Sequence, residues 1–192
     1  LTKGRKHMKI KDIILHRLQI PLTTPYHLAF GDLHHFDTVL VEVGDGDGGT
    51  GFGDATVIEA YSGESIDATW AFCRARAQEI VGDTAAGAHG SLMNFHHDNP
   101  FAVTSLVSAI EMLEGNAILA PTTEQRVPLL IPTTATALDA IPAEIDDLIG
   151  QGYGTLKIKV GFHVDDDLLR FATIQKAAAG RVLLRLDGNQ GY

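Results

Sequence analysis

Two lysines and one aspartate have the residue types and the spacing that proton-transfer chemistry requires. Lys157 and Lys159 stand two positions apart in a predicted strand, so both side chains point to the same face. Asp187 ends the next apolar segment, just before Gly188 and Asn189. A lysine can act as a general acid or base, and a carboxylate can bind a hard cation such as Mg²⁺. A solvent-exposed strand face for the lysines and an ordinary turn at Asp187 are the structural alternatives.

The elements that carry these residues alternate between strands and helices. Apolar segments predict strands at 127–131, 155–160 and 181–187, with helices at about 140–150 and 165–179 between them. This order predicts parallel strands with right-handed crossovers. In a (β/α)₈ barrel the active site lies at the carboxyl ends of the strands, where Lys159 and Asp187 fall. Three strands cannot close such a barrel, so we expect the front portion of a longer protein; a complete three-stranded domain is the alternative.

The order of expected elements in residues 8–120 predicts a separate α+β domain, which consists of an antiparallel meander followed by two helices. Strands are expected at 8–20, 37–44 and 50–55, and residues 21–36 are expected to form a loop. Ser62 is the predicted cap of the first helix. The apolar stripe of this first helix consists of Ile66, Trp70, Cys73, Ala77 and Ile80. The second helix begins at Asn99-Pro100 and has the stripe Val103, Leu106, Ile110 and Leu113. The predicted division is therefore 1–7 (a tag or upstream residues), 8–120 and 121–192.

Composition excludes several classes of protein. The 192 residues are 45% hydrophobic and 20% charged, which excludes wholesale disorder. A net charge of −9 makes a nucleic-acid partner unfavourable. No apolar run approaches the ~18–20 residues of a membrane span, so no membrane partner is expected. A single cysteine, Cys73, excludes an internal disulfide framework, and we expect a cytoplasmic protein.

Taken together, the motifs resemble one known family. The pattern Gly152-x-x-x-x-Lys157-x-Lys159, followed by Arg185-x-Asp187-x-Asn189, resembles the mandelate racemase/muconate-lactonizing branch of the enolase superfamily. The segment 51–55, Gly-Phe-Gly-Asp-Ala, is similar to part of that branch's capping domain. Three positions depart from the common family residues without removing a chemical group that the reaction needs: Asp54, Gly188 and Tyr192.

The resemblance implies an α+β capping domain followed by the start of a modified TIM (β/α)₈ barrel, with about three strands present. It implies removal of the proton α to a carboxylate in a small substrate, assisted by Mg²⁺ or, as a substitute, Mn²⁺. By carry-over, Lys159 is the acid/base, and Lys157 favours its neutral form by like-charge repulsion. Asp187 is the first metal ligand, and Asn189 orients substrate or ligand.

Two segments of the first domain resemble the family's substrate-covering loops. Tyr26, His27 and Phe30 belong to one of them, and Val57 and Tyr61 to the other. The implied protein is a homo-oligomer, and the 192-residue chain alone is expected to be inactive, because the family takes further metal ligands from later strands.

The overall reaction stays open between a cycloisomerase, a dipeptide or N-acylamino-acid epimerase, and an o-succinylbenzoate synthase. The alternatives are an acid-sugar dehydratase of the same superfamily and a non-catalytic fragment or binding module that keeps the fold. The Lys-x-Lys pair favours the first group over the dehydratases.

Overall fold

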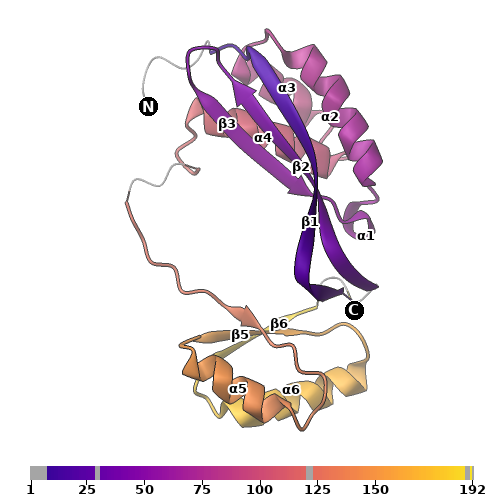
Figure 1. Ribbon diagram of the computed structural model, residues 1–192, viewed down its shortest axis with the longest axis vertical. Helices are drawn as coiled ribbons and strands as arrows, with labels where there is room; N and C mark the ends of the chain where they lie inside the picture. The colour runs from indigo at the N-terminus through magenta and orange to yellow at the C-terminus, as the bar shows by residue number, and fades with distance from the viewer. Residues whose placement is uncertain (1–7, 29–30, 120–122, 189–190, 192) are drawn as a thin grey trace. The chain divides into compact units, whose positions relative to one another are not determined.

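The structure is a computed structural model that describes residues 8–28, 31–119, 123–188 and 191. The chain divides into two compact units, Leu1–Thr123 and Glu124–Tyr192, and each is described by itself (Figure 1). The segment 1–7, which we expect to be a tag or upstream sequence, lies outside the described residues.

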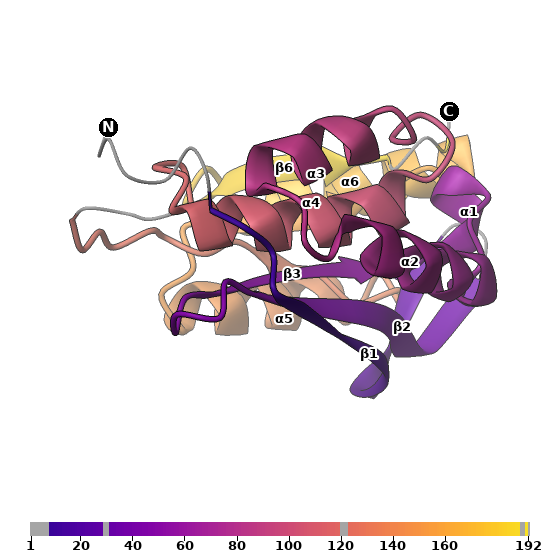
Figure 2. The same ribbon diagram turned by 90° about the horizontal axis from the view of Figure 1, so that it is seen from above.

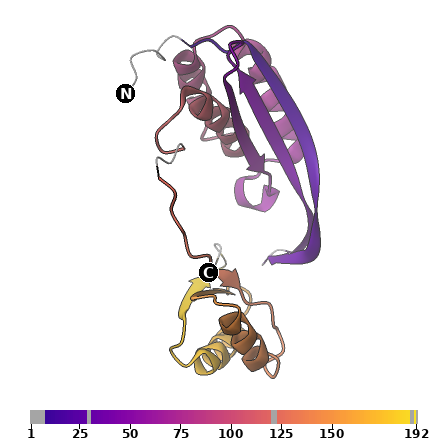
Figure 3. The same ribbon diagram turned by 60° about the vertical axis from the view of Figure 1, so that its left-hand side comes forward.

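The first unit is a three-stranded antiparallel sheet with helices on one face. The strands lie in the order β1-β2-β3. Their bounds are Asp12–Leu28 for β1, Gly31–Gly44 for β2 and Thr50–Thr56 for β3. The helices are α1 (Glu59–Ser62), α2 (Ile66–Ile80), α3 (Ala85–Met93) and α4 (Pro100–Glu114). Figures 2 and 3 show α2, α3 and α4 on the same side of the sheet. The core lies between the sheet and these helices, and Val39, Val41 and Val43 of β2 are fully buried in it.

The predicted loop at 21–36 is wrong, because most of it is strand. β1 and β2 continue as a long two-stranded ribbon, in which Pro21 pairs with His35 and Tyr26 with Leu33. The register shifts between Pro21 and Tyr26, so the ribbon carries an irregularity there. Proline cannot donate a ladder hydrogen bond, but an edge strand tolerates it, and β1 is at the edge of the sheet.

The first long helix was predicted in the right place but with the wrong cap. Ser65 caps α2, since its side chain accepts a hydrogen bond from the Ala68 amide. Ser62 instead accepts one from the Glu64 amide. Trp70 is only partly buried, because Thr69 takes the fully buried position of that turn beside Cys73. The sequence also failed to predict α1 and α3.

Glu64 has an unexpected role at the beginning of another helix. Its side chain, 5% exposed, accepts hydrogen bonds from the Phe101 amide (2.7 Å) and the Ala102 amide (3.3 Å). These amides lie in the first turn of α4, where backbone N–H groups lack helical partners. Glu64 therefore caps α4 from a position 37 residues before Phe101 in the sequence.

Two glycines of β3 allow α4 to lie directly on the sheet. A Cβ added at Gly51 would lie 2.0 Å from the Ala109 carbonyl oxygen, and one at Gly53 would lie 2.1 Å from the Ser105 carbonyl oxygen. Both contacts are with helix backbone, which cannot move aside as a flexible side chain can. Helix α4 buries the whole predicted stripe, Val103, Leu106, Ile110 and Leu113.

The second unit is a three-stranded parallel sheet in the order β4-β5-β6 with two crossover helices. The strands are β4 (Ile131–Pro132), β5 (Thr155–Lys159) and β6 (Leu183–Asp187), and the helices are α5 (Ile141–Gly150) and α6 (Val164–Ala178). Both helices pack on one face, where Ile145, Ile158 and Ile174 are fully buried. Strand β4 shares only Ile131 with the predicted strand 127–131. Val127 and Leu129, which precede β4, are each 72% exposed.

The contact between α4 and β3 predicts opposite effects of two glycine-to-alanine changes. Gly53→Ala should lower the free energy of unfolding by about 3 kcal/mol or more, because the methyl group displaces helix backbone. Gly90→Ala should raise it by about 0.5–1 kcal/mol, because Gly90 is helical and an added Cβ meets open space. Urea unfolding of both variants checks this, and equal effects would contradict the close approach.

Candidate active site

The two predicted lysines and the predicted aspartate meet at the carboxyl ends of β5 and β6. The Lys159 Nζ lies 2.9 Å from the Asp187 Oδ2, and the Lys157 Nζ lies 3.1 Å from the same oxygen. The side chains of Lys159 and Asp187 are 12% and 25% exposed. Two ammonium groups therefore share one carboxylate in a partly dehydrated site.

The parallel register explains why these groups meet. Lys159 pairs with Asp187 and Lys157 with Arg185, so all four residues lie on the same face of the sheet. Residues on the other face alternate with them, and Ile158 is fully buried there against the helices. The structure thus separates an apolar face that holds the fold from a charged face that can do chemistry.

The lysines control the ionisation of Asp187. Burial raises the pKa of the Asp187 carboxyl, but hydrogen bonds from Lys159 and Lys157, together with their positive charges, outweigh burial and lower the pKa below its usual range. The carboxylate is therefore ionised at neutral pH.

Acidic residues on the helices hold the loops next to these strand ends, and sequence reasoning missed them. Asp167, in the first turn of α6, accepts hydrogen bonds from the Gly161 amide (2.8 Å) and the Phe162 amide (3.0 Å), just after β5. Glu144 of α5 accepts hydrogen bonds from the Thr134 amide and hydroxyl, both at 2.6 Å, after β4. Their only sequence signal is an acid in a first helical turn, which is common to many helices.

The loops after β5 and β6 also touch each other through glycine. Gly161 has a φ of 103°, and a Cβ added there would lie 2.8 Å from the Gly188 carbonyl oxygen. The loop that follows Lys159 and the loop that follows Asp187 therefore pack backbone to backbone. The positive φ and this contact explain why the sequence has glycine at position 161.

Of the other predicted site residues, two lie in the first unit and two lie outside the described residues. Tyr26 lies on β1, where its ring contacts that of Phe36 edge to face at 6.0 Å. Tyr61 lies in α1, in the same unit. Phe30 and Asn189 lie outside the described residues.

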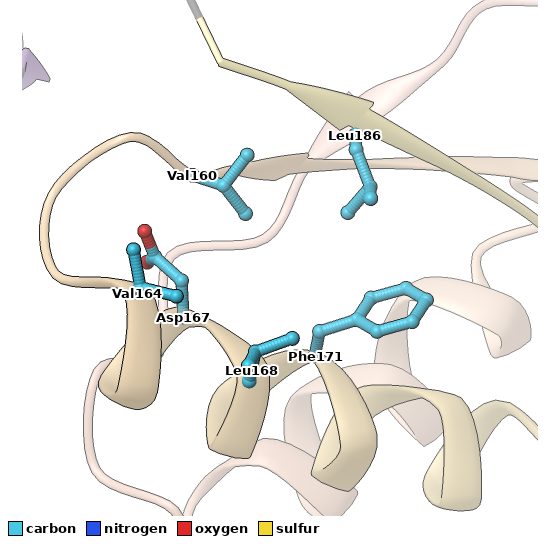
Figure 4. A pocket seen from close by; sticks show the side chains of 6 residues that line it. All are labelled: Val160, Val164, Asp167, Leu168, Phe171 and Leu186. Carbon is cyan, nitrogen blue, oxygen red and sulfur yellow. The ribbon is translucent and has the colours of Figure 1, made fainter. Parts of the chain in front are cut away.

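An apolar hollow in the second unit lies away from the charged face. It has a volume of about 360 Å³. Its lining is Val160, Val164, Asp167, Leu168, Phe171 and Leu186 (Figure 4). Val160 and Leu186 alternate with Lys159 and Asp187 along their strands, so they project from the opposite face. The hollow is therefore distinct from the lysine–aspartate cluster.

Comparison with known proteins identifies relatives along almost the whole chain. No protein-family model matches it. The L-Lys-D/L-Arg epimerase of Desulforapulum autotrophicum is 28% identical over 96% of this chain and 55% of its own length. A crystal structure of a mandelate racemase/muconate lactonizing protein from Herpetosiphon aurantiacus superimposes with a TM-score of 0.82 at 26% identity, over 96% of this chain and 54% of that one. The expected resemblance to the mandelate racemase/muconate-lactonizing branch of the enolase superfamily is confirmed.

A second similar solved structure contains a metal and a dipeptide. The dipeptide epimerase from Methylococcus capsulatus, crystallised with Mg and the dipeptide L-Arg-D-Lys, has a TM-score of 0.79 at 26% identity, over 96% of this chain and 55% of that one. The chain spans about half the length of the curated relatives it matches. Its fold is that of their capping domain followed by the start of the (β/α)₈ barrel.

Two further observations bear on ligands and partners. Within residues 8–28, 31–119, 123–188 and 191, no group of three or more His, Cys, Asp or Glu side chains could hold a metal ion. In that same part of the chain, no helix combines the length and the apolar character needed to cross a membrane.

The shared carboxylate predicts a pH dependence. Because the folded pKa of Asp187 is depressed, its ion pairs stabilise the fold above the unfolded pKa of about 3.9, and this stabilisation is lost as the pH falls through the folded pKa. Lys159→Met should raise the pKa of Asp187, because it removes one of the two lysines whose contacts offset the effect of burial.

A carboxyl-carbon NMR titration of Asp187 measures this shift directly. Lys176→Met is the matched control, since Lys176 is exposed on α6 and should leave the Asp187 midpoint unchanged. A midpoint that stays in place in Lys159→Met would contradict the ion pair.

Proposed function

We propose that the full-length protein containing this chain is an isomerase that removes the proton α to a carboxylate, and that its substrate is a dipeptide or an N-acylamino acid. The cluster of Lys157, Lys159 and Asp187 at the strand ends is the observation that carries this proposal. The substrate class is supported by the relatives, among them an L-Lys-D/L-Arg epimerase and a dipeptide epimerase crystallised with L-Arg-D-Lys.

The two lysines have different roles in this proposal. Lys159 is the last residue of β5, pairs with Asp187 and is 12% exposed. It therefore lies at the strand end where barrel active sites form, and in this proposal it moves the proton to and from the substrate. Lys157 lies one strand repeat further from the strand end and is 22% exposed. Its charge disfavours a second ammonium beside it and attracts the substrate carboxylate.

Asp187 suits one position of a magnesium site. Its carboxylate oxygens are the ligands that Mg²⁺ prefers, and the side chain is exposed enough to be reached. Mg²⁺, or Mn²⁺ in its place, would neutralise the substrate carboxylate as negative charge develops. The described residues supply this single ligand, and further ligands come from elsewhere in the full-length protein.

The remaining parts of the proposal concern the domain division, the substrate-binding residues, the cellular location and the oligomeric state. We propose that residues 8–120 form the capping domain and residues 121–192 the first barrel units. Tyr26, Phe30, Tyr61 and Asn189 are the proposed substrate-binding residues. We also propose a cytoplasmic homo-oligomer, a setting in which Cys73, free and buried, stays reduced.

The assignment of the base predicts the behaviour of two lysine variants. In the full-length protein, Lys159→Ala should lower exchange of the substrate α-hydrogen with solvent deuterium by about 10²–10⁴-fold on the face that this lysine serves. Lys157→Arg keeps a positive charge and should retain part of the activity, although Arg occupies the space differently.

The assay is deuterium incorporation followed by NMR, on a panel of dipeptides and N-acylamino acids that includes Lys/Arg dipeptides. Lys176→Ala is the control for loss of a lysine outside the site. Wild-type rates on both faces in Lys159→Ala would overturn the assignment.

The metal assignment predicts a second result. Asp187→Asn should weaken Mg²⁺ binding to the full-length protein by at least about tenfold, because a neutral amide is a poorer ligand than a carboxylate. Titration calorimetry with Mg²⁺ measures the affinity, with the exposed Asp166→Asn as control. Equal affinity in wild type and Asp187→Asn would rule out Asp187 as a ligand.

A further inference from the structure

Arg170 of α6 binds the ends of two parallel strands at once. Its Nε donates to the Ala135 carbonyl (3.1 Å), and its Nη1 donates to the Lys159 carbonyl (2.9 Å). Its Nη2 lies within hydrogen-bond distance of the Thr133 carbonyl (3.3 Å) and hydroxyl (3.2 Å). One guanidinium thus joins the segment after β4 to the last residue of β5.

The contact with Lys159 uses the backbone and leaves the side chain to the charged face. The Lys159 carbonyl accepts the hydrogen bond from Arg170, while the Nζ of the same residue contacts Asp187. Where strand pairing ends, a backbone carbonyl needs another donor, and Arg170 supplies one. The strand end from which the ammonium projects is therefore held from α6.

We propose that Arg170 is a positioning residue for Lys159, fixing the end of β5 so that the ammonium is correctly placed for proton transfer. This inference rests on the proposed function, in which Lys159 moves the proton. Catalytic groups must be held to within about 0.5 Å, and a displacement of about 1 Å can cost 10²-fold in rate. No charge from Arg170 takes part in the chemistry.

The geometry requires arginine in particular. A guanidinium presents five N–H groups in a planar fork, and here its three nitrogens reach oxygens of three residues. Lysine has a single nitrogen and cannot span that set of acceptors. Arg170→Lys should therefore behave like Arg170→Met.

Arg181 offers a matched control in the same unit. Its Nε donates to the Ala178 carbonyl (3.2 Å), and its Nη2 contacts the Ala177 carbonyl (2.7 Å) and the Asp146 carboxylate (2.6 Å). Arg181 itself lies between α6 and β6, near the opposite end of β6 from Asp187, and its partners lie at the end of α6 and in α5. Arg181→Met should thus remove a similar set of bonds without touching Lys159.

The first measurement is amide hydrogen exchange on the full-length protein. The Thr133 amide donates to the Lys157 carbonyl, and the Val160 amide donates to the Asp187 carbonyl, so both report on the strand ends. Arg170→Met should speed exchange at these two amides by about tenfold or more relative to the rest of the unit, whereas Arg181→Met should not. A merely structural role would speed exchange throughout the unit in both variants.

The second measurement is the α-proton exchange rate of the same variants. Arg170→Met should lower kcat by about 10–100-fold with KM changed less than about threefold, because substrate contacts remain while the base is misplaced. Arg181→Met should keep kcat close to wild type. If Arg170→Met does not fold, Arg170→Lys takes its place in both experiments.

The outcomes separate this inference from the function on which it rests. Unchanged exchange at Thr133 and Val160, or unchanged kcat despite faster exchange, would overturn the positioning role. A wild-type protein that shows no α-proton exchange on any substrate of the panel would overturn the proposed function; the amide exchange alone then decides whether Arg170 holds the strand ends.

Discussion

The register of β5 against β6 is the constraint on which the candidate site depends. It places Lys159 opposite Asp187 and brings both lysine ammoniums within 3.1 Å of one carboxylate oxygen. A shift by one residue would turn the charged side chains into the apolar face and the isoleucine of β5 out of it. The burial of Leu156 and Ile158 against α5 and α6 therefore specifies the position of the chemistry as well as the stability of the unit.

The charged cluster is a balance of opposing terms. Two cations close together in a partly dehydrated site repel each other and lose hydration, and Asp187 offsets both costs. The same carboxylate is the group proposed to bind metal. Asp187 therefore neutralises the two lysines in this structure, and it is also the residue that would hold a metal cation next to them. The helices contribute from the other side, since Asp167 and Arg170 hold the backbone around Lys159 without entering the charged face.

The outline of the fold could be predicted from sequence, but several long-range details could not. Apolar periodicity located α2, α4, α5, α6 and the strands β3, β5 and β6 to within a few residues. The continuation of β1 and β2 through residues 21–36 was missed because Pro21 and a segment rich in Thr, His, Gly and aromatic residues suggest a loop, whereas an edge strand tolerates proline. Helix α3 was missed because Gly87 and Gly90 lower its helix propensity, which tertiary contacts override.

The sequence by itself determined which residue types stand at the ends of two adjacent parallel strands, because a period of two places Lys157 and Lys159 on one face and strand order places Asp187 beside them. Only the tertiary structure decided what surrounds them. Glu64 caps a helix 37 residues further along the chain, and Arg170 reaches back 35 residues to Ala135. Such partners are chosen by the three-dimensional path of the backbone, and no local pattern of residues encodes that path.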